Sequence, residues 1–522
     1  MKTYGREVIY ANYTEEELLN GTEEQIVNKI IDILSNSVNL HEKNRGEILY
    51  LQDYLYGDQD IKHKEKKTRT DINNKNVENW AYAFNDWKKT FLLGKPIKYA
   101  PLNDVSSDEI TELNRFCTYE DKEWLDQEIY EDIFTCGRGF RYVFGSKVDE
   151  NDETPFELLN LDVENTEVVY SSSINHEQLL SYIMTSKKYI TQYVDPKTGE
   201  ARTDWSYYDE YNVYTRNKLY VINTKNGWYQ LVDTKPLIFN THIITEYYMN
   251  RKRMGFLEIV KDILDDINYI ENLDLDDMEA FVNSIMVFTN AEVDGETMEA
   301  IQQYGAVSIK STDQKKASVE ILQSRLKSLD TQILYLRKLS AIHNILAVPQ
   351  ANNNGEVSNA ETGKAMLTGQ GFTSASIRIE GEEKAFKRCD REALKNIIKI
   401  CKMSKDSIIR TLKVADIESK FNRDLSDNLL TKTQALINLT TAKIPPEIRN
   451  QVIGLFADPV SVTKLQEQFE EEQRQLQQEI FKRQNTENND NEENTNKDNN
   501  TNKINEQNNK ISKAKENEEQ GQ

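Results

Sequence analysis

The sequence has few cysteines and no long apolar run. It holds four cysteines among 522 residues, and none has the Cys-x-x-Cys spacing of a zinc or redox site. In a chain of this length we interpret them as buried thiols of a reducing cytoplasm. No apolar stretch approaches the roughly 20 residues that cross a bilayer, and residues 1–10 lack the apolar centre of a signal peptide. We therefore expect a soluble protein with no membrane contact.

Positive charge is also scarce. The chain has 87 acidic residues against 65 lysines and arginines, which gives a formal net charge of −22. Proteins that hold duplex DNA tightly neutralise its phosphates with clusters of lysine and arginine. The composition therefore argues against tight DNA binding, and any DNA that this protein handles is held loosely. A length of 522 residues predicts several folding units.

The sequence lacks a catalytic constellation. Its five histidines are scattered singly, without metal-ligand spacing. The stretch Glu361–Ala365 resembles a nucleotide P-loop, but Ser358 and Ala365 stand where that loop needs a glycine and a serine or threonine. The acidic run Asp274–Glu279 lacks the spacing of a calcium loop, so we interpret it as a solvated helix face. We predict no enzyme activity and no metal or other cofactor.

Periodicity predicts a predominantly helical α+β protein. In residues 1–100, helical patterns cover Glu23–Leu34, Leu40–Tyr56 and Asn79–Leu93. Between residues 139 and 248 the pattern changes to short β-branched and aromatic runs, which predict an antiparallel sheet. The runs are Phe140–Phe144, Glu167–Tyr170, Leu180–Ile183 and Lys218–Ile222. Asn226 and Gly227 predict a two-residue hairpin turn, because both positions of such a turn need positive φ.

Apolar residues at alternating steps of four and three predict two long helices in the middle of the chain. The first stripe consists of Phe256, Val260, Ile263, Ile267 and Ile270. The second stripe consists of Leu322, Leu326, Leu329, Ile333 and Leu336. Acidic residues cover much of the rest of the first helix, whereas lysine and arginine are interleaved in the second. Narrow stripes on long helices need neighbouring helices, so this pattern indicates a wall built from repeated copies of one chain.

A small insert separates the two helices. Val282–Thr289 and Ala306–Lys310 predict strands that flank a short helix at Glu296–Tyr304, after a turn at Asp294 and Gly295. Basic residues gather where the insert meets the second helix: Lys310, Lys315, Lys316, Arg325 and Lys327. Two interpretations of these residues remain open. They pair with the acidic first helix of the same or a neighbouring subunit, or they form a ring of positive charge that faces a polyanion.

A polar, Asn-rich loop follows the second helix. It spans residues 349–359 and includes Pro349, Gln350, Asn352, Asn353, Asn354, Gly355, Glu356, Val357 and Ser358. This loop is longer than an ordinary helical hairpin needs. Asn359–Met403 then predicts a third helical region, kinked at its glycines. We expect the folded part to end with a short strand around Lys420 and small helices that start near Pro446 and after Pro459. The composition from about residue 484 onward predicts disorder.

Several motifs, in this order along the chain, resemble one protein family. They are Tyr54–Gly57, Asp71–Asn74, Phe91–Ile97, Glu167–Ser171, Gly255–Glu258 and Ser358–Ala365. Each motif is short, and their order over residues 40–470 carries the resemblance. The chain resembles the portal proteins of tailed bacteriophages, of the long-tailed type common in phages of Gram-positive hosts.

The resemblance implies a portal fold with a wing, a two-helix stem, a small α/β clip and a helical crown. In this numbering the implied parts are a wing over 1–253 and 360–425, stem helices over 254–281 and 319–348, a clip over 282–318, a tunnel loop over 349–359, a crown over 426–480 and a disordered tail over 481–522. The clip, with Asp294, Gly295 and Glu296 at its turn, would contact partner proteins, and the tunnel loop would face DNA.

The same resemblance implies a role in the virion. Copies of the chain would form a ring, a dodecamer in the family, at one capsid vertex, and double-stranded DNA would be packaged and ejected through its channel. Terminase, head-tail adaptor, major capsid and scaffolding proteins would be its partners, with assembly in the host cytoplasm. One alternative stays open, a non-enzymatic oligomeric scaffold or adaptor protein that is not tied to DNA translocation.

Overall fold

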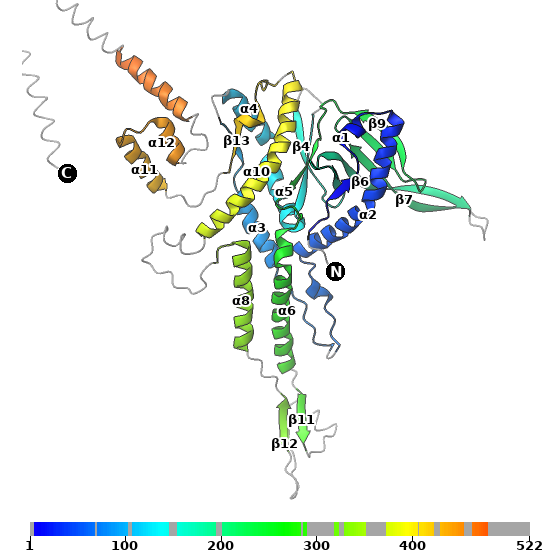
Figure 1. Ribbon diagram of the computed structural model, residues 1–522. Helices are drawn as coiled ribbons and strands as arrows, with labels where there is room; N and C mark the ends of the chain where they lie inside the picture. Colours follow the sequence, from blue (N-terminus) through cyan, green and yellow to red (C-terminus); the bar gives the residue numbers. More distant parts are fainter. Residues whose placement is uncertain are drawn as a thin grey trace, which may run out of the picture. The chain divides into compact units, whose positions relative to one another are not determined.

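The computed structural model divides the chain into two compact units, Met1–Ser426 and Asp427–Gln522 (Figure 1). The residues that it describes are 5–67, 70–102, 107–145, 154–194, 201–282, 285–289, 318–322, 328–350, 372–405, 407–421, 429–453 and 462–478. Helices and sheets both contribute, which confirms the α+β class. None of the described helices combines the length and the apolar character that a membrane span requires.

Two helices with threonine caps open the first unit, α1 (Glu15–Leu19) and α2 (Glu23–Leu55). α2 runs without a break, so the prediction of two separate helices in this region was wrong. Polar side chains between the two predicted helices bond back to the preceding turn of α2. Ser35 Oγ donates to the Asp32 carbonyl at 2.9 Å, and Ser37 Oγ donates to the Leu34 carbonyl at 3.0 Å. These bonds keep polar residues compatible with a continuous helix.

Three further helices precede the sheets. α3 (Trp80–Leu93) confirms the predicted third helix, with Asn79 as its N-cap. α4 (Ser107–Tyr119) and α5 (Lys122–Cys136) follow, and α5 packs against α3, α4 and the first strand after it. Gly137 ends α5 with a φ of +81°, and a Cβ there would lie 2.1 Å from the Arg253 carbonyl oxygen. Only glycine therefore fits this junction.

The larger sheet has six strands in the order β1-β5-β6-β7-β8-β9. These strands are β1 (Ile9–Ala11), β5 (Thr166–Ser171), β6 (Gln178–Val194), β7 (Ala201–Tyr214), β8 (Lys218–Asn223) and β9 (Gln230–Pro236). Neighbours are antiparallel except β1 and β5, so the predicted antiparallel sheet is confirmed. Ile26, Ile30 and Ile33 of α2 pack with Leu180 and Tyr182 in the core on one face of this sheet.

The hairpin predicted at Asn226 and Gly227 is present, but its turn is longer than two residues. β8 ends at Asn223 and β9 begins at Gln230. Gly227 has a φ of +85°, whereas Asn226 is not among the residues with positive φ. Asn226 Nδ2 instead donates to Gln230 Oε1 at 2.8 Å. The prediction of a two-residue turn at Asn226 and Gly227 was therefore wrong, because the Gly227 N–H donates to the Thr224 carbonyl at 2.9 Å and closes a turn centred on Lys225 and Asn226.

A second sheet places β3 (Arg138–Gly145) between β10 (Ile244–Tyr248) and β4 (Phe156–Leu161). α5 and the long helix α10 (Phe372–Met403) pack on this sheet. β2 (Lys98–Pro101) pairs with β13 (Ile417–Lys420), which confirms the strand predicted around Lys420. Short 3-10 helices lie at Asp60–His63 and Val414–Asp416.

Two long helices, α6 (Phe256–Val282) and α8 (Ser328–Leu346), lie side by side (Figure 1). β11 (Ile285–Thr289) pairs with β12 (Ser318–Leu322) between them in sequence. β12 occupies residues that we predicted as the start of the second helix, so that boundary was wrong. The ladder pairs Val319 with Phe288 and Ile321 with Met286, and β-branched residues such as valine and isoleucine favour strands. The strand predicted at 306–310 and the helix at 296–304 lie outside the described residues.

The second unit is helical. It contains α11 (Leu429–Thr441), α12 (Pro446–Ile453) and a helix over residues 462–478, as the sequence predicted for this region. The tail predicted to be disordered from residue 481 lies outside the described residues.

Charged side chains join the elements inside the first unit. Arg138 of β3 donates two hydrogen bonds, of 2.6 and 2.8 Å, to the Glu167 carboxylate of β5. Arg141 of the same strand donates to Asp126 of α5 at 2.9 Å. All these groups are buried, so removing one partner would leave an uncompensated charge. The four cysteines are free and buried, as predicted.

Candidate assembly surface

The helix α6 presents three different sides, and the first side is apolar and buried. Val260, Leu264 and Ile267 are at most 2% exposed and pack in one cluster with Ile342 and Leu346 of α8. This cluster also takes in residues of α2, α3 and α5. The paired helices are therefore anchored in the core of the first unit, with the α8 contact as its outer layer.

The residues of the stripe predicted on the first helix lie on the side of α6 that faces the core of the subunit. Val260 and Ile267 are buried, and Ile270 is 9% exposed. Phe256 and Ile263 are partly buried against the same cluster.

The stripe predicted on the second helix is not the face that packs on α6. Leu322 belongs to β12, and Leu326 lies outside the described residues, as does the side chain of Leu329. Ile333 and Leu336 are 63% and 44% exposed in the single subunit. Because the helix begins at Ser328, Leu322 lies outside α8, and the described stripe members Ile333 and Leu336 lie on its exposed side.

The second side of α6 holds residues 72–79, which we call the strap, through buried amide side chains. Asn268 Oδ1 accepts the backbone N–H of Glu78 at 2.8 Å, and Asn272 Oδ1 accepts that of Asn76 at 2.7 Å. Asn272 Nδ2 also donates to the Asn76 carbonyl at 2.7 Å. Four residues of helix rise about 6 Å, close to the roughly 6.6 Å of two extended residues. One turn of α6 therefore advances about as far as two residues of the strap, so every fourth residue of α6 meets every second residue of the strap.

Asp276 continues this ladder one turn further along α6. Its Oδ1 accepts the backbone N–H of Asn74 at 2.7 Å, and its Oδ2 lies 2.9 Å from Lys64 Nζ and 3.2 Å from Lys66 Nζ. Burial raises the pKa of the Asp276 carboxyl, but the bonds from Asn74 and the two lysines outweigh it and lower the pKa to about 2. The prediction of a solvated acidic face was wrong here, because the strap and the lysines cover Asp276. The spacing of Asn268, Asn272 and Asp276 was the sequence signal that we missed.

The third side of α6 is exposed and mixes apolar with acidic residues. Ile259, Tyr269 and Leu273 are 43%, 53% and 39% exposed. Asp262 and Asp266 are exposed and fall on the same side, since the five positions alternate by steps of three and four. This side therefore carries apolar surface framed by negative charge.

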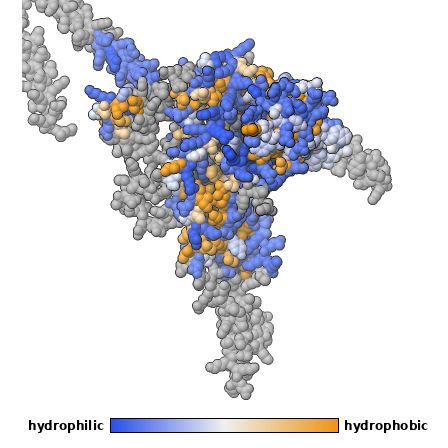
Figure 2. All heavy atoms as spheres, in the orientation of Figure 1, coloured by the Kyte–Doolittle hydropathy of each residue, from blue (hydrophilic) through white to orange (hydrophobic). Residues whose placement is uncertain are grey.

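The exposed side of α8 is apolar with a basic border. Ile333, Leu334, Leu336 and Ile345 are between 39% and 63% exposed, and Arg337 is exposed among them. Figure 2 shows apolar residues gathered over the paired helices. One basic residue at the edge, Lys338, is paired within the subunit, with its Nζ 2.6 Å from Asp266 of α6. The exposed sides of the two helices are thus similar in apolar character, and α8 carries the exposed Asp330 and Arg337 where α6 carries Asp262 and Asp266.

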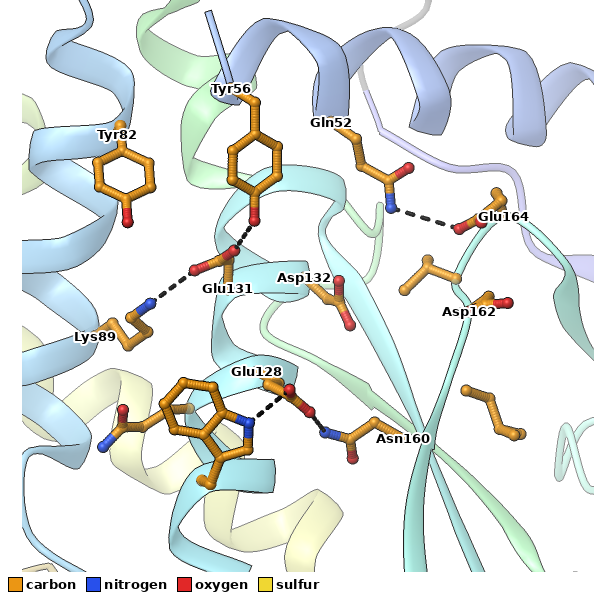
Figure 3. Close-up of a pocket in the computed structure, with 14 residues that line it drawn as sticks. Gln52, Tyr56, Tyr82, Lys89, Glu128, Glu131, Asp132, Asn160, Asp162 and Glu164 are labelled. Atoms are coloured by element: carbon orange, nitrogen blue, oxygen red, sulfur yellow. Dashed lines mark hydrogen bonds and ion pairs between the residues drawn. The ribbon is translucent and has the colours of Figure 1, made fainter.

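A separate acidic pocket of about 510 Å³ lies among α2, α3, α5 and the turn between β4 and β5 (Figure 3). Most of its polar groups bind one another. Tyr56 Oη donates to Glu131 at 2.5 Å, Lys89 Nζ lies 2.7 Å from Glu131, and Trp124 Nε1 donates to Glu128 at 2.7 Å. Among the described residues no group of histidine, cysteine and acidic side chains has the arrangement to hold a metal ion.

Replacing Asp132 of this pocket by asparagine is expected to stabilise the protein. Burial, and then the neighbouring carboxylates, raise the pKa of Asp132 well above its usual 3.8. The folded state therefore opposes its ionisation, and this cost grows as pH rises above 3.8. We expect Asp132→Asn to raise the free energy of unfolding at pH 8 by about 1–3 kcal/mol, measured by urea unfolding. The exposed Asp162→Asn serves as the matched control, and a destabilised Asp132→Asn protein would contradict the expectation.

A family model described as phage portal protein, SPP1 Gp6-like, matches residues 35–480. The chain belongs to this family. No curated protein matches the chain. Membership confirms the resemblance to tailed-phage portal proteins, which are structural components of the capsid that take part in DNA packaging. The family also implies a homo-oligomeric ring. The exposed sides of α6 and α8 are surfaces available for contacts between portal subunits.

Most of the other predicted site residues lie outside the described part of the chain. The basic residues Lys310, Lys315, Lys316, Arg325 and Lys327 lie outside the described residues. The same holds for Asp294, Gly295 and Glu296, and for residues 351–359 of the Asn-rich loop. Pro349 and Gln350 are described, directly after α8. The roles of all these residues stay predictions.

Proposed function

We propose that this chain is the subunit of a ring that forms the DNA channel at one vertex of a phage capsid. The observation that carries the proposal is the pair of exposed apolar sides on α6 and α8. In the ring, the α8 side of one copy packs against the α6 side of the next. Different surfaces meet at every contact, so the interface is heterologous and a fixed rotation per copy closes a ring.

Under this proposal the paired helices form the stem wall. A helix of 27 residues such as α6 is about 40 Å long. Apolar burial between copies supplies most of the association, since exposed ion pairs contribute only about 0–1 kcal/mol each. The segment between α6 and α8 forms the clip that docks terminase during packaging and the head-tail adaptor afterwards. Residues 360–425 and 1–253 form the wing, and residues 426–480 form the crown.

The net charge of −22 suits a conduit that DNA must slide through. An acidic channel repels the phosphate backbone, so the duplex meets few contacts that would slow its passage. The asparagines of loop 349–359 offer neutral hydrogen-bonding groups that touch DNA weakly. The basic residues near 310–327 are then a local exception, either paired with α6 acids or facing the polyanion.

The native mass of the purified protein, paired with negative-stain images, tests the proposal. Closed rings of about a dozen subunits are the expected result. A 60.7 kDa monomer at high concentration, which persists when capsid and scaffolding proteins are added, would refute the ring and favour an adaptor protein.

Deleting residues 352–355 is expected to leave ring assembly intact and to reduce the DNA retained in each particle. The deletion shortens the loop that we place against DNA and leaves α6 and α8 unchanged. Native mass checks the ring, and nuclease-resistant DNA per particle checks packaging. Normal packaging by the deletion variant would refute the tunnel-loop assignment.

A further inference from the structure

The helix over residues 462–478 is exposed on all sides for most of its length. From Glu467 to Gln478 every side chain is exposed. Its large apolar residues form one stripe, in which Leu465, Phe469 and Leu476 are 63%, 61% and 55% exposed. Steps of four and seven place them on one face of a helix. A solitary helix of this length is only marginally stable in water, so the stripe calls for a packing partner.

Contacts from the rest of the second unit reach only the first turns of this helix, within the part of the chain that the structure describes. Asn450 Nδ2 donates to Thr463 Oγ1 at 3.1 Å and to Gln466 Oε1 at 3.0 Å. Arg449 Nη2 donates to the same Gln466 oxygen at 3.3 Å. The stripe beyond Gln466 therefore has no cover from α11 or α12 of its own chain among the described contacts.

The α11–α12 pair has an apolar surface of its own and the opposite charge. Ile437 of α11 and Ile448 of α12 are 55% and 51% exposed. Residues 429–453 contain three basic residues and one acid, whereas residues 462–478 contain four glutamates and two basic residues. This surface can therefore take apolar contacts, and its net positive charge suits an acidic helix.

We propose that the helix 462–478 of one copy packs across the α11–α12 pair of the neighbouring copy. The inference rests on the ring proposed above and adds a second contact to it. The stripe with Phe469 and Leu476 covers Ile437 and Ile448, while the net charges of −2 on the helix and +2 on the pair attract each other. A contact of this kind is also heterologous, so its repetition locks the ring at its crown.

Introduced cysteines test the contact in the full-length ring. The variant Ile437→Cys/Phe469→Cys is oxidised and run on a denaturing gel without reductant. The four native cysteines are buried, so cross-links come from the new pair. The expected result is a ladder of covalent multimers that reductant abolishes. The matched control Ile437→Cys/Glu471→Cys, with the second cysteine on the opposite face of the helix, should run as a monomer.

The possible outcomes separate this inference from the ring itself. A monomer band, or a faster monomer band that reports a disulfide within one chain, would overturn the inference if native mass still shows rings. Absence of rings from the unsubstituted protein would overturn both proposals. A second variant, Phe469→Ser, changes an exposed residue and should fold normally. Its rings are expected to dissociate at a lower urea concentration than the unsubstituted rings, and unchanged dissociation would also contradict the inference.

Discussion

Replacing Ile333 by aspartate is expected to abolish the ring while leaving the subunit folded. Ile333 is 63% exposed on α8, so the new carboxylate is hydrated in a free subunit. In the proposed ring the same position faces the third side of the neighbouring α6, beside the exposed Asp262 and Asp266. Burying an unpaired charge costs several kcal/mol per ion, and the ring repeats this cost at every contact. Native mass should therefore show monomers, with an unchanged circular dichroism spectrum and melting midpoint.

Two comparisons make this result specific to the α6–α8 contact. Ile238, which follows β9, is 75% exposed, and Ile238→Asp should keep its rings. Ile267 is fully buried in the core of the subunit, so Ile267→Asp is expected to unfold the chain and cannot report on assembly. Full rings from the Ile333→Asp protein would refute the assignment of this α8 face to the interface.

Periodicity predicted α6 well because its apolar stripe packs into the core of its own subunit. Val260, Ile267 and Ile270 recur at the helical period, and the core of the same subunit buries all of them. α8 has apolar residues on two sides, one toward α6 and one exposed. A hydrophobic pattern shows that a face seeks a partner, but not whether that partner is the same chain or another copy. The predicted stripe at Ile333 and Leu336 lies on the exposed side.

The prediction for Asp276 was wrong because a sequence does not show the hydrogen-bond partners of a polar residue. Asp276 was interpreted as solvated, yet Lys64 and Asn74, some 200 positions earlier, cover it. Contacts between residues so far apart in the chain follow from the fold rather than from local pattern.

The family resemblance depended on the order of short motifs, and the structure explains why some of them are fixed. In Gly255–Glu258, a Cβ on Gly255 would lie 2.4 Å from the Thr135 carbonyl oxygen. Glu258 Oε2 accepts the Gly255 N–H at 2.7 Å and its other oxygen binds Arg6. This motif therefore sets the start of α6 against α5 and the N-terminal segment. Residues 358–365, the last motif, lie outside the described residues, so its role stays a prediction.

Replacing Asp276 by alanine is expected to lower the free energy of unfolding at pH 7 by about 3–5 kcal/mol, the range for breaking a buried ion pair by removing one partner. The side chain of Asp276 is 1% exposed and lies between Lys64 and Lys66. Its removal takes the carboxylate from both ammonium groups and from the Asn74 N–H, and among the described residues only Lys66 Nζ keeps a second acceptor, the Ile72 carbonyl at 3.0 Å. The adjacent Asp277→Ala, which removes a more exposed carboxylate from the same turn, is the matched control and should change stability little.

The pH dependence identifies the cause of this loss. The folded-state pKa of Asp276 is about 2, below its ordinary value of 3.8. A carboxyl with a lowered folded pKa stabilises the fold above the unfolded pKa, and this contribution disappears as pH falls from about 4 toward 2. Urea unfolding at a series of pH values should therefore show a constant difference between the two proteins above pH 5 that shrinks below pH 4. A difference that persists unchanged at the lowest pH would mean that Asp276 acts through packing alone. The strap would then be held by Asn268 and Asn272, without a contribution from the ion pairs of Asp276.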